Sequence, residues 1–239
     1  MNAAVIFAGG VGVRMGRGTT PKQFLSIYGK PIIVYTLEVF EACGEIDAVC
    51  VSCVSSHLSY MQSLCDKYQL RKVKWIVPGG ETGQLSIYNG IQKLHETCPP
   101  DTVVLIHDGV RPLIDEALLR NNIAAVKAYG SAVSCAGAVE THVRLDQDGA
   151  ITDVEARRES AVAKAPQSFR LGDIYDAHRK AMAAQRDDFI DSASLMRYYG
   201  YQLHAVPCGR DNIKITEPAD YFIVKSIIDA RQDSQVFGV

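Results

Sequence analysis

The sequence carries almost no excess charge of either sign, because 25 Lys and Arg residues are balanced by 27 Asp and Glu residues for a formal net charge of −2. This balance argues against a protein that coats nucleic acid or binds membranes through a polybasic surface. We therefore expect neither nucleic acid nor a membrane as a partner. Any phosphate chemistry must depend on a local cluster of cations within a nearly neutral protein.

Long apolar runs and paired metal-binding cysteines are also missing. The first ten residues, MNAAVIFAGG, lack the basic start and the apolar length of a signal peptide or a membrane span. The seven cysteines are scattered, and the one CxxC, Cys50 to Cys53, lies in a run typical of a buried strand. Inert free thiols without an export signal predict a cytoplasmic protein.

Two common nucleotide-binding motifs are absent. The sequence has neither the GxxxxGKS/T P-loop nor the GxGxxG dinucleotide fingerprint, so ordinary ATPase chemistry and hydride transfer lose support. What is present is a globular composition, 47% hydrophobic and 22% charged, in which apolar strand-like runs alternate with helical patterns. We expect strands at 3–8, 48–54, 73–77, 102–107 and 131–139, and helices at 32–42, 57–68, 85–94 and 115–129.

This alternation predicts an α/β fold with a doubly wound, mostly parallel sheet covered by helices on both faces. Such a sheet binds ligands beyond the carboxyl ends of its strands. Residues 140–167 break the pattern, since they are polar and contain the turn-like sequence Gln147-Asp148-Gly149. We expect one domain, residues 1–239, with a β-hairpin arm at about 140–167. A strand at 202–207 and a helix at 218–230 complete the expected order.

The first expected strand runs into a glycine-rich loop followed by cations. Glycines directly after a buried strand let the backbone approach a nucleotide closely, and their N–H groups can face its phosphates. Arg14 and Lys22 add positive charge beside them. The plain alternative is a flexible turn. The expected nucleotide-binding residues of this loop are Ala8, Gly9, Gly10 and Gly12.

A second glycine pair, Gly79-Gly80, follows another expected strand, and Ser86 comes shortly after it. This arrangement suggests a close backbone approach, with a hydroxyl that could bond a base edge. Alone the signal is weak, since a loop and a helix N-cap give the same pattern.

Two further segments place charge next to apolar runs. Asp108 ends an apolar strand in the sequence HDGVRP, where a carboxylate could bind a hard cation or a ribose. The alternative is a structural ion pair with Arg111. Lys214 lies between two isoleucines in DNIKIT, an awkward position for a solvated lysine, which favours a catalytic or phosphate-binding role.

Together these motifs resemble those of 2-C-methyl-D-erythritol 4-phosphate cytidylyltransferases and ribitol-5-phosphate cytidylyltransferases. The matching segments are AGGVGVRMG, PKQFL, GKPIIVYTLE, HDGVRP, APQSF and DNIKITEPAD, in a consistent order from about residue 3 to 228. The resemblance implies an enzyme that joins CTP to a polyol phosphate and releases pyrophosphate, with Mg²⁺ as cofactor. Charge on the α-phosphate would then be stabilised by preorganised cations.

The resemblance also implies individual roles. The catalytic residues would be Arg14, Lys22 and Lys214. Asp108 would lie on the ribose or metal side of CTP, while Gly79, Gly80 and Ser86 would read the cytosine. A homodimer is implied, in which the arm completes the neighbouring site. The polyol phosphate would be bound by Arg111, Thr141, Arg157 and Asp191.

Three residues depart from the family pattern. Gly83 stands at an arginine position, Ala165 at the threonine of TPQ, and Ile190 at the threonine before Asp191. The last change removes a hydroxyl that could touch the polyol phosphate. We therefore expect D-ribitol 5-phosphate as acceptor, which would place the enzyme in surface-polymer synthesis such as that of teichoic acid. Methylerythritol 4-phosphate, an isoprenoid precursor, is the alternative.

Two hypotheses of other kinds stay open. The chain could transfer a different nucleotide to a sugar 1-phosphate, although HDGVRP, APQSF and NIKIT argue against this. It could also be a nucleotide-binding module without turnover, against which the retention of Arg14, Lys22, Asp108 and Lys214 argues.

Overall fold

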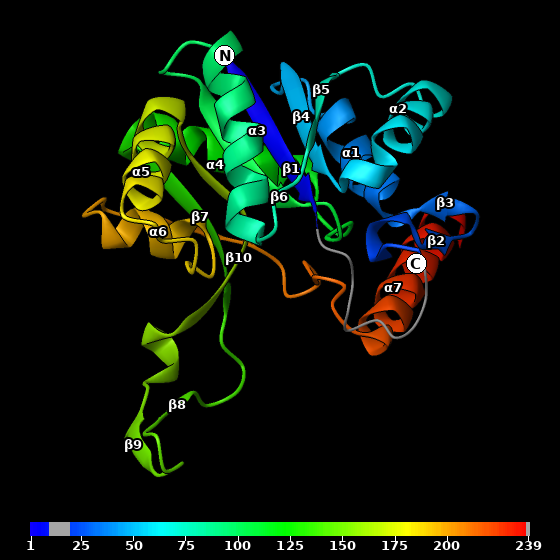
Figure 1. Ribbon diagram of the computed structural model, residues 1–239. Helices are drawn as coiled ribbons and strands as arrows, with labels where there is room; N and C mark the ends of the chain where they lie inside the picture. The colour runs from blue at the N-terminus through cyan, green and yellow to red at the C-terminus, as the bar shows by residue number, and fades with distance from the viewer. Residues whose placement is uncertain (10–19, 238–239) are drawn as a thin grey trace.

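A seven-stranded sheet forms the centre of the computed structural model, which describes residues 1–9 and 20–237 (Figure 1). Its strand order is β11-β7-β10-β6-β1-β4-β5, and every neighbouring pair is parallel except the two that involve β10. This confirms the predicted mostly parallel sheet. The strands are β1 (Asn2–Ala8), β4 (Ala48–Cys53), β5 (Val73–Pro78), β6 (Val103–Asp108), β7 (Ser131–Gly137), β10 (Ala161–Arg170) and β11 (Ala205–Pro207).

Helices cover both faces of the sheet, because its central strands are apolar on both sides. In β1, Ala4 and Ile6 pack into one apolar cluster while Ala3 and Val5 pack into the other. The first face is covered by α1 (Ile32–Ala42), α2 (Leu58–Lys67) and α4 (Glu116–Tyr129), and the second by α3 (Gly83–Thr97), α5 (Leu171–Ala183) and α6 (Ser192–Tyr198).

The C-terminal helix α7 (Pro218–Phe237) forms a third, smaller cluster near the start of α1. Its Val224 and Ile228 pack with Ile27 and Ile32. Ile27 belongs to the short hairpin of β2 (Ser26–Ile27) and β3 (Lys30–Pro31), which follows the one-turn helix η2 (Lys22–Phe24). A second such turn, η3 (Ser55–His57), precedes α2. This packing brings residues after the first loop next to the C-terminal segment.

The arm projects from the body below the sheet (Figure 1). Its tip is the hairpin of β8 (Val143–Leu145) and β9 (Ile151–Val154), followed by η4 (Arg157–Glu159). The predicted bounds of 140–167 run too far, however, because β10 begins at Ala161 and its last residues pair with β6 and β7 in the main sheet. The return limb of the arm is thus the one antiparallel strand of the sheet.

No helix within the described ranges is both long and apolar enough to cross a membrane.

Candidate active site

Gly9, which follows β1, meets the Gly79–Gly80 turn at the carboxyl end of β5. The Gly79 amide donates to the Cys53 carbonyl at 2.6 Å, while the Ser86 hydroxyl accepts from the Gly80 amide at 3.0 Å. Gly9 packs so closely against this turn that a Cβ there would lie 2.3 Å from Ser86 Oγ. Of the residues that the sequence assigned to the nucleotide, Gly9, Gly79, Gly80 and Ser86 therefore lie together, and glycine is needed at position 9 for the backbones to approach.

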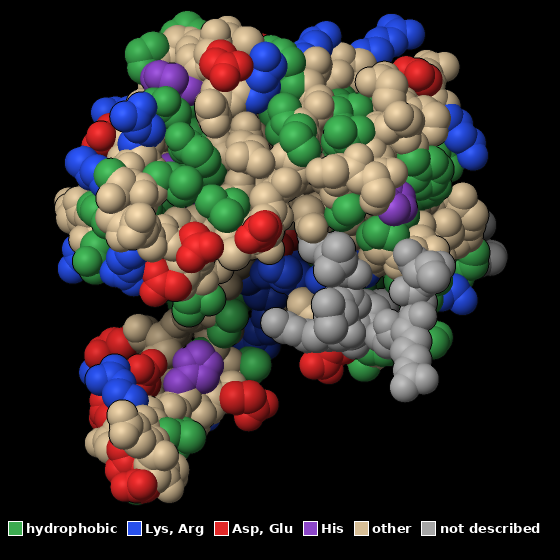
Figure 2. Space-filling view, in the orientation of Figure 1, with side chains coloured by type: hydrophobic (Ala, Val, Ile, Leu, Met, Phe, Trp, Pro, Cys, Tyr) green, Lys and Arg blue, Asp and Glu red, His purple; other side chains and the backbone are tan. Residues whose placement is uncertain are grey.

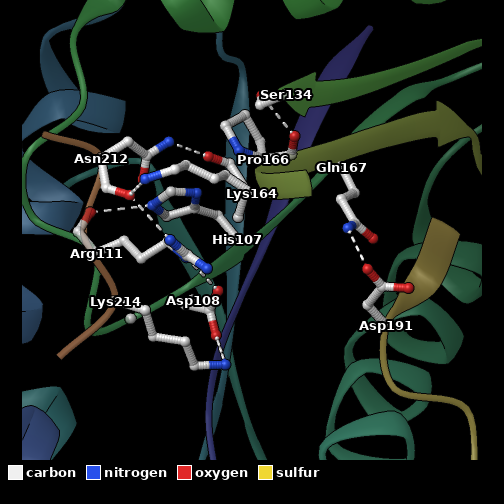
Figure 3. A network of polar contacts seen from close by, with 12 residues as sticks. His107, Asp108, Arg111, Ser134, Lys164, Pro166, Gln167, Asp191, Asn212 and Lys214 are labelled. Atoms are coloured by element: carbon white, nitrogen blue, oxygen red, sulfur yellow. Dashed lines mark hydrogen bonds and ion pairs between the residues drawn. The ribbon is translucent and has the colours of Figure 1, made fainter. Parts of the chain in front are cut away.

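A buried aspartate paired with two cations lies at the carboxyl end of β6, the strand next to β1 in the sheet (Figure 3). Asp108 Oδ2 accepts from Arg111 Nε at 2.8 Å, and Asp108 Oδ1 lies 2.5 Å from Lys214 Nζ. The carboxylate is 7% exposed, whereas the Lys214 side chain is 38% exposed. Lys214 also lies over the ring of Phe7, 5.7 Å from its centroid. Three predicted site residues thus form one cluster.

The charge state of Asp108 is set by its two cations. Burial alone would raise the pKa of this carboxyl, but the nearby Lys214 and Arg111 outweigh burial and hold the pKa below its ordinary value. Asp108 is therefore ionised at neutral pH.

The loop that carries Lys214 is held by hydrogen bonds to its backbone. Lys164 Nζ donates to the carbonyls of Arg210 and Asn212, each at 3.0 Å, and Arg111 Nη1 donates to the same Asn212 carbonyl at 3.0 Å. The Asn212 side chain in turn donates to the Ala165 carbonyl at 2.6 Å. The positions of Arg111 and Lys214 are thereby fixed relative to β10 (Figure 3).

Asp191 lies across the site from this cluster, at the start of α6 (Figure 3). It caps the helix by accepting from the Ser194 amide at 2.8 Å, and its other oxygen accepts from Gln167 Nε2 at 2.8 Å. Between the two sides lies a pocket of about 270 Å³ lined by Asp108, Arg111, Lys164, Asp191 and Lys214, among others. Figure 2 shows Lys and Arg side chains in the hollow above the base of the arm.

The three departures from the family pattern all line this pocket. Gly83 is the first residue of α3, and a Cβ there would meet nothing within 4 Å. Ala165 is buried, while Ile190 is 94% exposed at the rim. At these three positions the lining of the pocket is therefore less polar than one arginine and two threonines would make it.

Lys22 lies close to the start of α7. Asp220 caps this region by accepting from the Thr216 hydroxyl at 2.7 Å and the Thr216 amide at 2.8 Å. Burial would raise the pKa of Asp220, but these hydrogen bonds and the charge of Lys22 together lower it. Lys22 thus faces the segment that follows Lys214.

The predicted arm residues also lie together, but apart from this pocket. Arg157 Nη2 donates to Thr141 Oγ1 at 3.3 Å on the arm, and neither residue lines the pocket of its own chain. Gly10, Gly12 and Arg14 lie outside the described residues, so their roles stay predictions.

The predicted metal role of Asp108 finds no protein cage around it. In the described part of the chain no three His, Cys, Asp or Glu side chains gather to hold an ion. Both Asp108 oxygens also face cations. The donors present do not by themselves fit Mg²⁺, which usually keeps water and phosphate oxygens as ligands.

Four residues of this site were missed by sequence reasoning. Lys164 lies in a polar stretch with no pattern to mark it. Gln84 bonds the carbonyl of Arg186 at 2.8 Å, and its own oxygen accepts from the Phe189 amide at 3.1 Å, which fixes the loop before Asp191. The others are Gln167, visible only as part of APQSF, and the buried His178.

The chain has the architecture of the nucleotidyltransferase fold, a mostly parallel sheet with a glycine turn and cations at its carboxyl edge. A structure of 4-diphosphocytidyl-2C-methyl-D-erythritol synthase from Anaerococcus prevotii superposes with a TM-score of 0.81 and covers 95% of each chain, at 23% identity. This likeness establishes the fold.

Sequence comparison goes further. The model of the family described as 2-C-methyl-D-erythritol 4-phosphate cytidylyltransferase matches residues 2–230, and the chain belongs to this family. A ribitol-5-phosphate cytidylyltransferase of Vibrio parahaemolyticus is 51% identical over the full length of both chains. One from Streptococcus agalactiae is 48% identical, again over the full length of both.

Proposed function

We propose that this enzyme transfers CMP from CTP to D-ribitol 5-phosphate and releases pyrophosphate. One observation carries the proposal: Lys214 and Arg111, both bonded to the buried Asp108, line a pocket at the carboxyl edge of the sheet, where Gly9 also packs against the Gly79–Gly80 turn. Such a site offers cations to phosphate groups next to a surface where a nucleotide backbone can lie.

The proposed step is an attack by a phosphate oxygen of the acceptor on the α-phosphorus of CTP. A phosphoanhydride bond forms, the bond between the α- and β-phosphates breaks, and pyrophosphate leaves with its electron pair. Negative charge grows on the α-phosphate oxygens. Lys214, half-exposed and fixed by Asp108, is placed to meet that charge, and Lys22 lies on the α7 side of the same loop. No covalent enzyme intermediate is needed.

The choice of acceptor rests on the relatives and on Ile190. Full-length relatives at 51% and 48% identity carry the ribitol name. The residue at the usual threonine position is an exposed isoleucine, which can offer no hydroxyl to a phosphate. Methylerythritol 4-phosphate remains the alternative acceptor, because the family takes its description from that activity.

Mg²⁺ is proposed as a cofactor held mainly by the CTP phosphates, since residues 1–9 and 20–237 gather no set of three His, Cys, Asp or Glu side chains to hold an ion. Treatment with a chelator should abolish pyrophosphate release, and added Mg²⁺ should restore it. Full activity in the chelated enzyme would contradict the proposal.

We also propose a cytoplasmic homodimer in which the arm reaches the neighbouring active site. Apolar side chains lie exposed along the arm, namely Val139, Val143, Leu145, Ile151, Val154 and Val162. Exposed apolar surface of this kind is typical of an interface. Thr141 and Arg157 would then meet the acceptor phosphate of the partner.

The first test measures pyrophosphate release from CTP with D-ribitol 5-phosphate and with methylerythritol 4-phosphate in parallel. UTP, GTP and ATP serve as nucleotide controls. Release with CTP and ribitol phosphate is expected. Pyrophosphate release with methylerythritol 4-phosphate alone would show that this compound, not ribitol phosphate, is the acceptor. CTP binding without pyrophosphate release would contradict the proposed enzymatic activity.

A further inference from the structure

Two buried polar side chains belong to the lining of the pocket, His178 of α5 and Ser192 of α6. Ser192 follows Asp191, which lies across the pocket from the cations (Figure 3), and we call this side of the pocket its inner end. Both side chains are almost fully buried, with exposed fractions of 1% for His178 and 3% for Ser192. The lining of the pocket also includes the apolar side chains of Ile87 and Leu195.

Neither residue has a hydrogen-bond partner within the described chain. Both ring nitrogens of His178 and the hydroxyl oxygen of Ser192 are buried without one. Buried polar groups in proteins are nearly always bonded, and each one left unpaired costs about 1–3 kcal/mol. Two such residues in the lining of one pocket point to a ligand that completes them.

The chemistry of the missing partner follows from the two side chains. Burial lowers the pKa of His178 to about 4, so its ring is neutral at neutral pH, with one nitrogen that donates and one that accepts. The ring stacks on Tyr88, with 5.6 Å between centroids, which fixes its plane. A serine hydroxyl likewise donates and accepts. The matching ligand group is small, uncharged and able to do both.

A phosphate does not suit this end of the pocket. The cations Arg111, Lys164 and Lys214 gather at the other end, where the phosphate is proposed to react. An alcohol suits the inner end, because a hydroxyl donates one hydrogen bond and accepts others. A polyol phosphate bound between the two ends presents its phosphate to the cations and its carbon chain to His178.

We propose that His178 and Ser192 form a hydroxyl subsite that binds the carbon chain of the acceptor polyol. The subsite rests on the proposed function, and within it selects acceptors by their hydroxyl groups. A site built to bond a hydroxyl discriminates strongly against a ligand that lacks it, since the buried groups are then left unpaired.

Steady-state kinetics of pyrophosphate release test the subsite. His178→Leu removes both nitrogens, while His178→Gln retains a donor and an acceptor. At saturating CTP, His178→Leu should lower kcat/KM for D-ribitol 5-phosphate at least about tenfold, chiefly through KM, with the KM for CTP little changed. His178→Gln should recover part of the loss. Ser192→Ala, a small change, should act in the same direction.

His95→Leu is the matched control. His95 lies on α3, is exposed, and stacks its ring on Tyr175 of α5 at 3.7 Å between centroids. His178 also stacks across the contact between α3 and α5, so this variant removes a histidine from the same helix contact but outside the pocket. Its kinetics should stay those of the wild type.

The outcomes separate the two proposals. A wild type that releases pyrophosphate with neither polyol phosphate would overturn the proposed function and the subsite with it. An active wild type with unchanged acceptor kinetics in His178→Leu and Ser192→Ala would overturn the subsite alone. If His178→Leu does not fold, Ser192→Ala decides by itself. A loss of kcat that is equal for all variants, without a change in KM, would also contradict the subsite.

Discussion

The two buried histidines should make the protein lose stability as the pH falls below about 6.5. Burial lowers the pKa of both His107 and His178 from 6.5 to about 4. In the folded protein both rings therefore stay neutral down to that pH, while in the unfolded chain they take up a proton near pH 6.5. Between these values the unfolded chain binds more protons, so the free energy of unfolding falls with falling pH.

The size of the effect follows from the pKa difference. Each ring contributes a slope of about 1.4 kcal/mol per pH unit within the window, and about 3 kcal/mol in total. Between pH 7 and pH 5 each histidine should thus account for a loss of about 2 kcal/mol. A loss of this size is a large fraction of the stability of an ordinary domain.

Urea unfolding at pH 7, 6 and 5 measures the slope, and His178→Leu isolates one ring. Between pH 6 and 5, the free energy of unfolding of the variant should fall less steeply with pH than that of the wild type, by about 1.4 kcal/mol per pH unit. Carboxylates such as Asp108 also contribute less to the free energy of unfolding as the pH falls. This contribution cancels when the slope of the variant is subtracted from that of the wild type. His95→Leu is the control, because the His95 ring reaches water in the folded protein as well as in the unfolded chain. Equal slopes in His178→Leu and the wild type would refute the reasoning.

Three further predictions concern the reaction. Lys22→Ala should lower kcat at least about a hundredfold with little change in the unfolding midpoint, because one stabiliser of transition-state charge is lost; near-normal turnover would contradict this role. Gly9→Ala should raise the dissociation constant for CTP in calorimetric titrations, since its Cβ would lie 2.3 Å from Ser86 Oγ, whereas Gly83→Ala, whose Cβ would meet nothing within 4 Å, should not; equal dissociation constants would argue against the close approach. Mixing inactive Lys22→Ala and Arg157→Ala subunits should restore about a quarter of wild-type activity, because half the dimers would hold one complete site; no recovery after confirmed exchange would contradict a shared site.

How far the sequence predicts the fold depends on how strongly each segment is patterned. The helix Ile32–Ala42 has the bounds that its apolar pattern indicates, because its buried face runs without interruption from Ile32 to Phe40. By contrast, β10 leaves the arm through exposed residues and becomes buried only from Ala165 onward. Its exposed first half is held by pairing to β7, and only the second half also pairs with β6, so no local pattern reveals the whole strand. The seven-residue helix α6 was missed for a similar reason, since it offers only one capping aspartate and two buried apolar side chains, Leu195 and Met196, as a pattern.

The residues of the candidate site likewise divide into those that the sequence pattern could place and those that it could not. Residues attached to strand ends, such as Asp108 and Gly79, could be placed from the sequence because a parallel sheet brings strand ends together. Lys164 could not, since its role depends on two backbone carbonyls 46 and 48 residues away along the chain. His178 could not either, because a lone histidine on an amphipathic helix gives no sign of which side chains will surround it.

The pairing of Asp108 bears on what the pocket offers to a ligand. A carboxylate at the end of a buried strand is compatible both with a metal site and with an ion pair, so the sequence left both open. In the folded chain the carboxylate is 7% exposed and faces two cations, while Lys214 reaches the pocket with 38% of its side chain exposed. An ammonium has three donors, and only one of them is needed for Asp108. The buried acid therefore serves to orient cations, and it is the cations that face the phosphates of a ligand.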